Sequence, residues 1–168
     1  MKRTRNLILL TVLSISFLNS YAMMPVKNAS EIKYNLEEAL HFCNLMNEKY
    51  STVSKVMNSP DFVRVCQWAG WAPTKAAAMT LRGNGSHNFC LSIDAYLEEA
   101  LVLAAKSNSK KLVDTIRSAR SWIRSASENS ELSLHSRSES EYEQYMTWTL
   151  NQNNKAREEI KKAVALLK

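Results

Sequence analysis

The sequence predicts an all-α protein: a small antiparallel helical bundle with a disulfide and a long C-terminal helix. Glycine and proline are rare, with three of each in 168 residues, and no segment sustains the alternation of a β-strand. Apolar residues instead recur in steps of three and four, which is the spacing of an amphipathic helix. Each apolar stripe must be buried against another, so the helices are expected to pack together.

The first predicted helix carries a stripe from Ile32 to Tyr50 and is expected to end near Tyr50. Asn28 and Glu31 are placed as a capping pair at its start. Residues 59–61, Ser-Pro-Asp, have the pattern of a second helix start, with proline at the first helical position.

That second helix is expected to break near Gly70 and Pro73, because proline lacks the amide hydrogen that a helix interior requires. A short helix over residues 74–81 follows. Residues 83–86, Gly-Asn-Gly-Ser, have the composition of a turn and are predicted to form one.

The remaining chain gives three further predicted helices. Stripes run from Phe89 to Leu103 and from Leu112 to Ile123, joined by a short polar connection at residues 107–109. Serine-rich residues 129–141 are predicted to be a linker, and residues 142–168 form the long last helix. Asn153 lies in the apolar seam of that helix, where a partner helix must satisfy its amide.

The chain begins with the three-part pattern of a secretory signal peptide. Three basic residues precede an apolar run from Leu7 to Leu18, and residues 20–22 end it with small residues at the positions a signal peptidase reads. The predicted domains are therefore a signal peptide (1–22), a helical bundle domain (23–128), the linker and the C-terminal helix. The apolar run is shorter than the roughly 20 residues that span a bilayer, so cleavage is favoured over a retained membrane anchor.

Charge and motifs limit the function classes. The formal net charge is +6, but three of the 22 basic residues lie in the signal peptide, which leaves 19 against 16 acidic residues. No basic arm or aromatic-and-basic platform indicates nucleic-acid binding. No catalytic or cofactor-binding motif is present, so we expect no enzymatic activity, no cofactor and no metal.

Three cysteines remain in the mature chain, and an oxidising compartment favours one disulfide among them. If the first helix ends near Tyr50 and the second starts at Pro60, Cys43 and Cys66 lie at similar heights on neighbouring antiparallel helices. This geometry favours a Cys43–Cys66 disulfide and leaves Cys90 free.

Other arrangements of the cysteines stay open. The rival disulfide is Cys66–Cys90, and all three residues can instead be buried thiols. A Cys₃His zinc set that includes His87 is a further alternative, although no CxxC pair is present.

The order of these elements resembles the Rap/Tai-type immunity proteins of type VI secretion systems, over about residues 36–126. The resemblance rests on the segments NLEEALHFC, VCQWAGWAPTKAAA, FCLSIDAYLEEALVLAA and SKKLVDTIRSARSWI, with matching residues Cys43, Cys66, Gly70, Trp71, Phe89 and Cys90. It implies a small helical periplasmic protein that neutralises a toxin, such as a peptidoglycan hydrolase, by direct binding. A cysteine often found at the end of that family's domain is missing here, which also suggests that Cys90 is unpaired.

The segment from residue 107 to 126 offers candidates for partner binding. Arg117, Arg120 and Arg124 share one helical face by their spacing, and Trp122 lies at its edge. The face is either a solvated surface paired with nearby glutamates or a docking site for an acidic protein, because arginine and tryptophan are frequent at interface hot spots. If the face is solvated, replacing all three arginines by alanine should leave the fold intact.

Two functions from different classes remain. The first is a periplasmic or secreted inhibitor that binds a toxin protein, and the second is a periplasmic or secreted helical chaperone or adaptor. Seven methionines and the separate C-terminal helix favour the second. A homodimer is left open.

Overall fold

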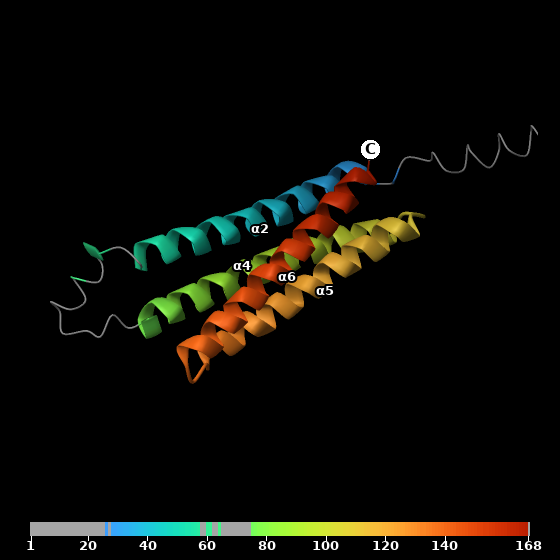
Figure 1. The fold of residues 1–168 in the computed structure, drawn as a ribbon. Helices are drawn as coiled ribbons and strands as arrows, with labels where there is room; N and C mark the ends of the chain where they lie inside the picture. Colours follow the sequence, from blue (N-terminus) through green and yellow to red (C-terminus); the bar gives the residue numbers. More distant parts are fainter. Residues whose placement is uncertain (1–25, 27, 58–59, 62–63, 65–74, 168) are drawn as a thin grey trace, which may run out of the picture.

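The structure, a computed structural model, describes residues 26, 28–57, 60–61, 64 and 75–167 (Figure 1). These residues form four long helices and no strand, which confirms the predicted all-α helical bundle. The helices are α2 (Ala29–Met57), α4 (Lys75–Ala105), α5 (Lys110–Leu134) and α6 (Glu139–Ala165).

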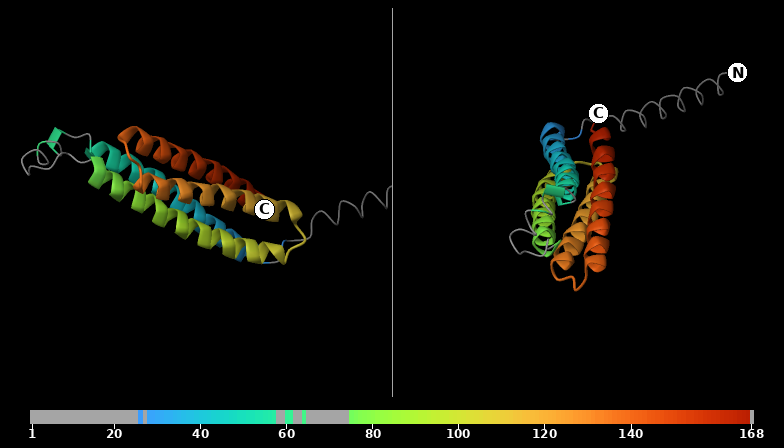
Figure 2. Two further views of the ribbon diagram at one scale, coloured as in Figure 1. Left: turned by 90° about the horizontal axis from the view of Figure 1, so that it is seen from below. Right: turned by 60° about the vertical axis from the view of Figure 1, so that its left-hand side comes forward.

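Each described helix packs against the next one in the sequence, and α6 packs back onto α2. Neighbouring helices run in opposite directions, so that the start of α2 and the end of α6 lie at the same end of the bundle (Figures 1 and 2). This is the up-and-down arrangement of a four-helix bundle.

The predicted apolar stripes form the core. On α2, all five residues from Ile32 to Met46 that continue the four-three spacing are buried, while Tyr50 is half-buried. On α6 the buried residues are those predicted from the spacing: Tyr142, Met146, Thr149, Asn153, Ala156, Ile160 and Ala163. The faces that α2 and α6 bury were therefore predictable from the apolar pattern alone.

Asn153 confirms the prediction of a polar residue that a partner helix must satisfy. It has no exposed surface, and its Nδ2 donates to the carbonyl oxygen of Cys43 at 3.0 Å and to Oδ1 of Asn47 at 3.0 Å. Both acceptors lie on α2, so this one amide fixes the register between α2 and α6.

The predicted turn at residues 83–86 is wrong, because α4 continues through both glycines without interruption. Gly83 instead allows α4 to pack closely against α5. A Cβ built on it would lie 2.6 Å from Cδ2 of Leu134 and 2.9 Å from Oγ of Ser133, both on α5. The carbonyl oxygen of Gly83 accepts a hydrogen bond from Oγ of Ser130 at 2.7 Å.

The predicted linker at residues 129–141 is much shorter in the structure. Helix α5 continues to Leu134, and only residues 135–138 separate it from α6. Ser130 and Ser133 are buried against α4, where the Ser133 hydroxyl donates back to the carbonyl oxygen of Ser130. Ser130 and Ser133 therefore belong to the helix interface, whereas Ser136 and Ser138 lie in the short connection.

Several predicted features lie outside the described residues, namely the signal peptide, most of the helix expected after residue 59, Cys66, Gly70 and Trp71. Within the described ranges, no helix combines the length and hydrophobicity that crossing a membrane requires.

The two glycines of α4 give a matched pair of predictions for stability. Gly83→Ala should lower the free energy of unfolding by about 1 kcal/mol, because its Cβ must displace Leu134 and Ser133. Gly85→Ala should raise it by about 0.5–1 kcal/mol, since a Cβ at Gly85 meets nothing within 4 Å and alanine favours the helix. Urea denaturation followed by far-UV circular dichroism measures both changes, and equal effects at the two positions would contradict the packing described here.

Candidate binding surface

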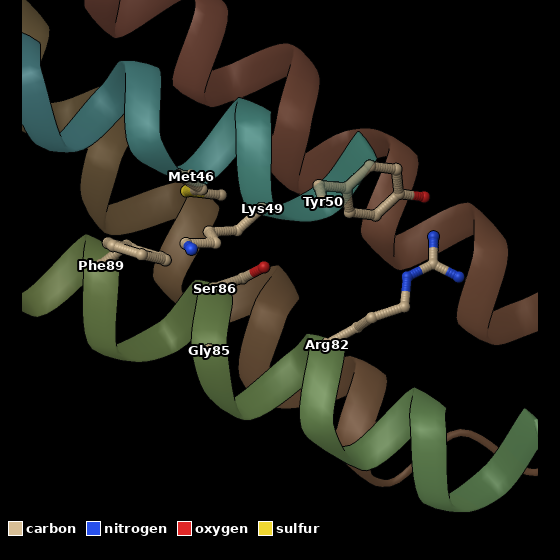
Figure 3. Close-up of a pocket in the computed structure, with 7 residues that line it drawn as sticks. All are labelled: Met46, Lys49, Tyr50, Arg82, Gly85, Ser86 and Phe89. Carbon is tan, nitrogen blue, oxygen red and sulfur yellow. The ribbon is translucent and has the colours of Figure 1, made fainter. Parts of the chain in front are cut away.

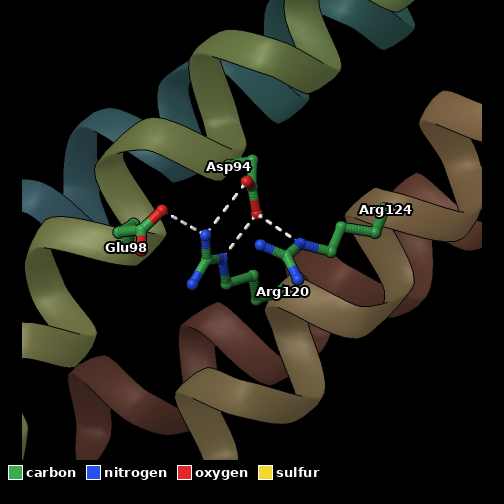
Figure 4. Close-up of polar contacts among 4 residues, drawn as sticks. All are labelled: Asp94, Glu98, Arg120 and Arg124. Carbon is green, nitrogen blue, oxygen red and sulfur yellow. Dashed lines mark hydrogen bonds and ion pairs between the residues drawn. The ribbon is translucent and has the colours of Figure 1, made fainter.

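Arg120 lies between α5 and α4, with 13% of its side chain exposed (Figure 4). Its Nε is 2.7 Å from Oδ1 of Asp94, and its Nη2 is 3.2 Å from Oδ2 of the same carboxylate. Nη2 also contacts Oε2 of Glu98. The hydrogen bonds that Arg120 donates to Asp94 raise the pKa of Arg120 above its ordinary value, so this charged side chain links the two helices.

The other two candidate arginines face outward. Arg124 is 59% exposed with its Nε 3.4 Å from Oδ1 of Asp94, and Arg117 is 65% exposed with its Nη1 3.5 Å from Oδ1 of Asp114. The three arginines therefore do not form one solvated face. The structure favours internal pairing for Arg120, while Arg117 and Arg124 stay accessible to a partner.

Trp122 lies on the side of α5 that faces α6. It is half-buried, and the ammonium of Lys155 lies 4.4 Å from the centre of its ring. About two turns further along α5 and about one turn back along α6, Nδ2 of Asn129 donates to Oε1 of Gln152 at 2.8 Å.

The same side of α6 carries an aromatic pair. Tyr145 and Trp148 meet edge to face with their ring centres 5.7 Å apart, and Trp148 is 44% exposed. Trp148 lies about one turn before Gln152, so the pair and Trp122 follow the same α5–α6 seam. We call Trp122, Tyr145, Trp148 and Lys155 the α5–α6 surface.

Trp148 was not among the candidate binding residues predicted from the sequence, but it is exposed. The apolar spacing of α6 passes through Met146 and Thr149, which are both buried, so position 148 falls beside the stripe and outside it. That offset from the stripe was the signal that could have identified Trp148 as a surface residue.

The structure does not support the predicted Cys43–Cys66 disulfide. Cys43 is a free thiol with no exposed surface, and Cys66 lies outside the described residues. The geometric basis of the prediction also fails, because α2 ends at Met57 and not near Tyr50. Cys43 is therefore 14 residues, or about 21 Å, from the end of its helix.

Cys90 is also a free thiol and is buried in the same core cluster as Cys43. Burial raises the pKa of both thiols to about 12. A thiol with such a pKa stays protonated at neutral pH and is a poor nucleophile and a poor metal ligand. In the described part of the chain, no three His, Cys, Asp or Glu side chains gather in a way that could hold a metal ion.

His87, named above in a possible zinc set, lies half-buried on α4. Its Nδ1 is 3.1 Å from Oγ of Ser127 on α5. The contact adds a further polar link between α4 and α5 beside those made by Arg120, Arg124 and Ser130.

The described chain is a four-helix bundle in which Trp148 is exposed beside the half-buried Tyr145 and Trp122 follows the same seam. Comparisons with models of known families, with curated proteins and with solved structures found no match to this chain. The argument for function therefore rests on the residues themselves.

Proposed function

We propose that this chain is an exported inhibitor that neutralises a secreted toxin, such as a peptidoglycan hydrolase, by direct binding in the periplasm. The observation that carries the proposal is Trp148, which is 44% exposed on the α5–α6 surface and meets the half-buried Tyr145 edge to face. Tryptophan and tyrosine supply much of the binding energy at protein interfaces. The signal-peptide pattern and the resemblance to periplasmic immunity proteins support the compartment and the class.

The charges of α5 suit an acidic partner. Arg117 and Arg124 are exposed on α5, Arg124 beside Asp94 of α4, and Lys155 lies over the Trp122 ring at the seam with α6. Positive charges at the rim of an interface accelerate association with an acidic protein and are screened by salt. Binding to the toxin should therefore weaken as the salt concentration rises.

Replacing Trp148 tests the proposal directly. Trp148→Ala should weaken binding to the proposed toxin by about tenfold or more, because the exposed indole is the largest anchor of the surface. Isothermal titration calorimetry with a catalytically inactive form of the toxin gives the affinity and the stoichiometry.

Tyr34→Ala is the matched control. Tyr34 is an aromatic residue on α2 that is 59% exposed and lies on a different helix from the α5–α6 surface. Equal losses of affinity in the two variants would contradict this assignment of the surface. Weak binding to many unfolded proteins, without a tight one-to-one complex, would instead favour the chaperone or adaptor alternative.

A further inference from the structure

A small pocket opens between α2 and α4, away from the α5–α6 surface (Figure 3). Its volume is about 50 Å³, which exceeds the roughly 30 Å³ share of one water molecule but is far below the 300 Å³ or more of a typical metabolite site. It therefore fits the end of one side chain or a small ion. The lining residues are Met46, Lys49, Tyr50, Arg82, Gly85, Ser86 and Phe89.

Arg82 is the unusual residue of this pocket. Only 5% of its side chain is exposed, and its guanidinium lies 4.2 Å from the centre of the Tyr50 ring. Nη1 is 3.2 Å from Oε1 of Glu143, but the buried Nε has no hydrogen-bond partner in the described structure. In Figure 3 that Nε lies on the Ser86 side of the guanidinium group. A buried charged donor without a partner is costly unless a ligand or water satisfies it.

Two further donors line the same pocket. Lys49 has no ion-pair partner among the described residues, and its side chain extends from α2 toward α4 (Figure 3). The Ser86 hydroxyl projects from α4 into the space between the helices. With Arg82, Lys49 and Glu143 as the charged groups, the net local charge is positive by one, which a single monoanion would balance.

The remaining walls are apolar. Met46 and Phe89 close one side, and Gly85 leaves open space, since a Cβ there would meet no atom within 4 Å. An anion with a short hydrocarbon stem suits this combination of walls and donors better than a fully hydrated inorganic ion does. We propose that the pocket binds a carboxylate on a short alkyl stem, with Lys49, Arg82 and Ser86 as donors. This inference stands independently of the proposed function.

Two-dimensional ¹H–¹⁵N NMR of the protein tests the site with sodium butyrate as the probe. Butyrate should shift the backbone amides of Lys49, Gly85 and Ser86 in a saturable way, beyond the shifts caused by sodium chloride at equal ionic strength. Lys49→Met and Gly85→Leu should each lower the affinity about tenfold, by removing a charge-assisted hydrogen bond and by filling the open space. Lys33→Met, which removes another exposed lysine of α2, should leave the affinity unchanged.

Two further probes identify the source of the carboxylate. A capped Ala-Glu-Ala peptide that binds at least as tightly as butyrate would assign the site to an acidic side chain of a partner protein. Binding of butyrate alone would assign it to a free short-chain acid. The proposal is overturned if phosphate binds more tightly than butyrate, or if the butyrate shifts equal those of chloride or persist in both pocket variants. Since none of these readouts uses the toxin, their outcome is separate from that of the proposed function.

Discussion

Asn153→Asp should lower the free energy of unfolding by about 3 kcal/mol at neutral pH. The amide nitrogen of Asn153 donates to the carbonyl oxygen of Cys43 and to Oδ1 of Asn47, and none of the side chain is exposed. A carboxylate at this position would place a buried negative charge against two acceptor oxygens. Urea denaturation of the variant and the wild-type protein measures the difference.

The penalty should depend on pH with a defined sign. Burial disfavours the charged form, so the pKa of the introduced carboxyl rises in the folded state above its ordinary value of about 3.9. The destabilisation should therefore be small near pH 4, where the protonated oxygen can donate to Cys43, and should grow as the pH rises to neutral.

Asn154→Asp is the control for this substitution, because it makes the same chemical change at the adjacent position. Asn154 is exposed, and its Oδ1 accepts from Nδ2 of Asn47 at 2.9 Å, a role that a carboxylate oxygen can keep. Its stability should stay within about 0.5 kcal/mol of the wild-type value. Similar losses in both variants would show that Asn153 has no special place between α2 and α6.

Arg120→Ala should lower the free energy of unfolding by about 2 kcal/mol. The substitution removes two hydrogen bonds to Asp94 and one contact to Glu98, all from a side chain that is largely buried between α4 and α5. Asp94, which is 25% exposed, would keep only its longer contact with Arg124. Thermal and urea denaturation both report this loss.

Arg117→Ala and Arg124→Ala provide the comparison. Both side chains are more than half exposed, and exposed ion pairs contribute little to stability. Each variant should remain within about 0.5 kcal/mol of the wild-type protein. If Arg124→Ala lowered the free energy of unfolding as much as Arg120→Ala, both arginines would contribute equally to the contact between α4 and α5. The conclusion that Arg120 makes the main contribution would then be wrong.

The last helix shows how much of the fold can be predicted from the sequence. Every residue of α6 from Tyr142 to Ala163 that lies on the four-three spacing is buried, including the two polar residues Thr149 and Asn153. A regular stripe of this length determines which face of a helix is buried, whatever the details of its neighbours. The need of Asn153 for a partner followed from the same pattern.

The middle of the chain could not be predicted in the same way. Gly83 and Gly85 have poor helix propensity, and residues 129–141 are rich in serine, so local composition indicated a turn and a linker. In the structure, Gly83 allows α4 to approach α5, and Ser130 donates to its carbonyl oxygen. These tertiary contacts join residues that are 47 positions apart, and no local pattern reveals them.

The candidate site was predictable only in part. Helical spacing placed the three arginines of α5 near one another, but it could not show that Asp94 and Glu98 of α4 lie opposite Arg120. The neighbour of a helix face depends on the packing of the whole bundle. The same limit applies to Trp122, whose position beside Lys155 depends on the register between α5 and α6.

Protection of cells in a defined compartment tests the central proposal most directly. A toxin that binds this chain is directed to the periplasm of a sensitive strain that expresses the chain either with residues 1–22 or without them. The proposal predicts that cells survive only when the chain carries residues 1–22, and that Trp148→Ala reduces survival while Tyr34→Ala does not. Equal survival with and without residues 1–22, or no protection by either form, would contradict the account of an exported inhibitor.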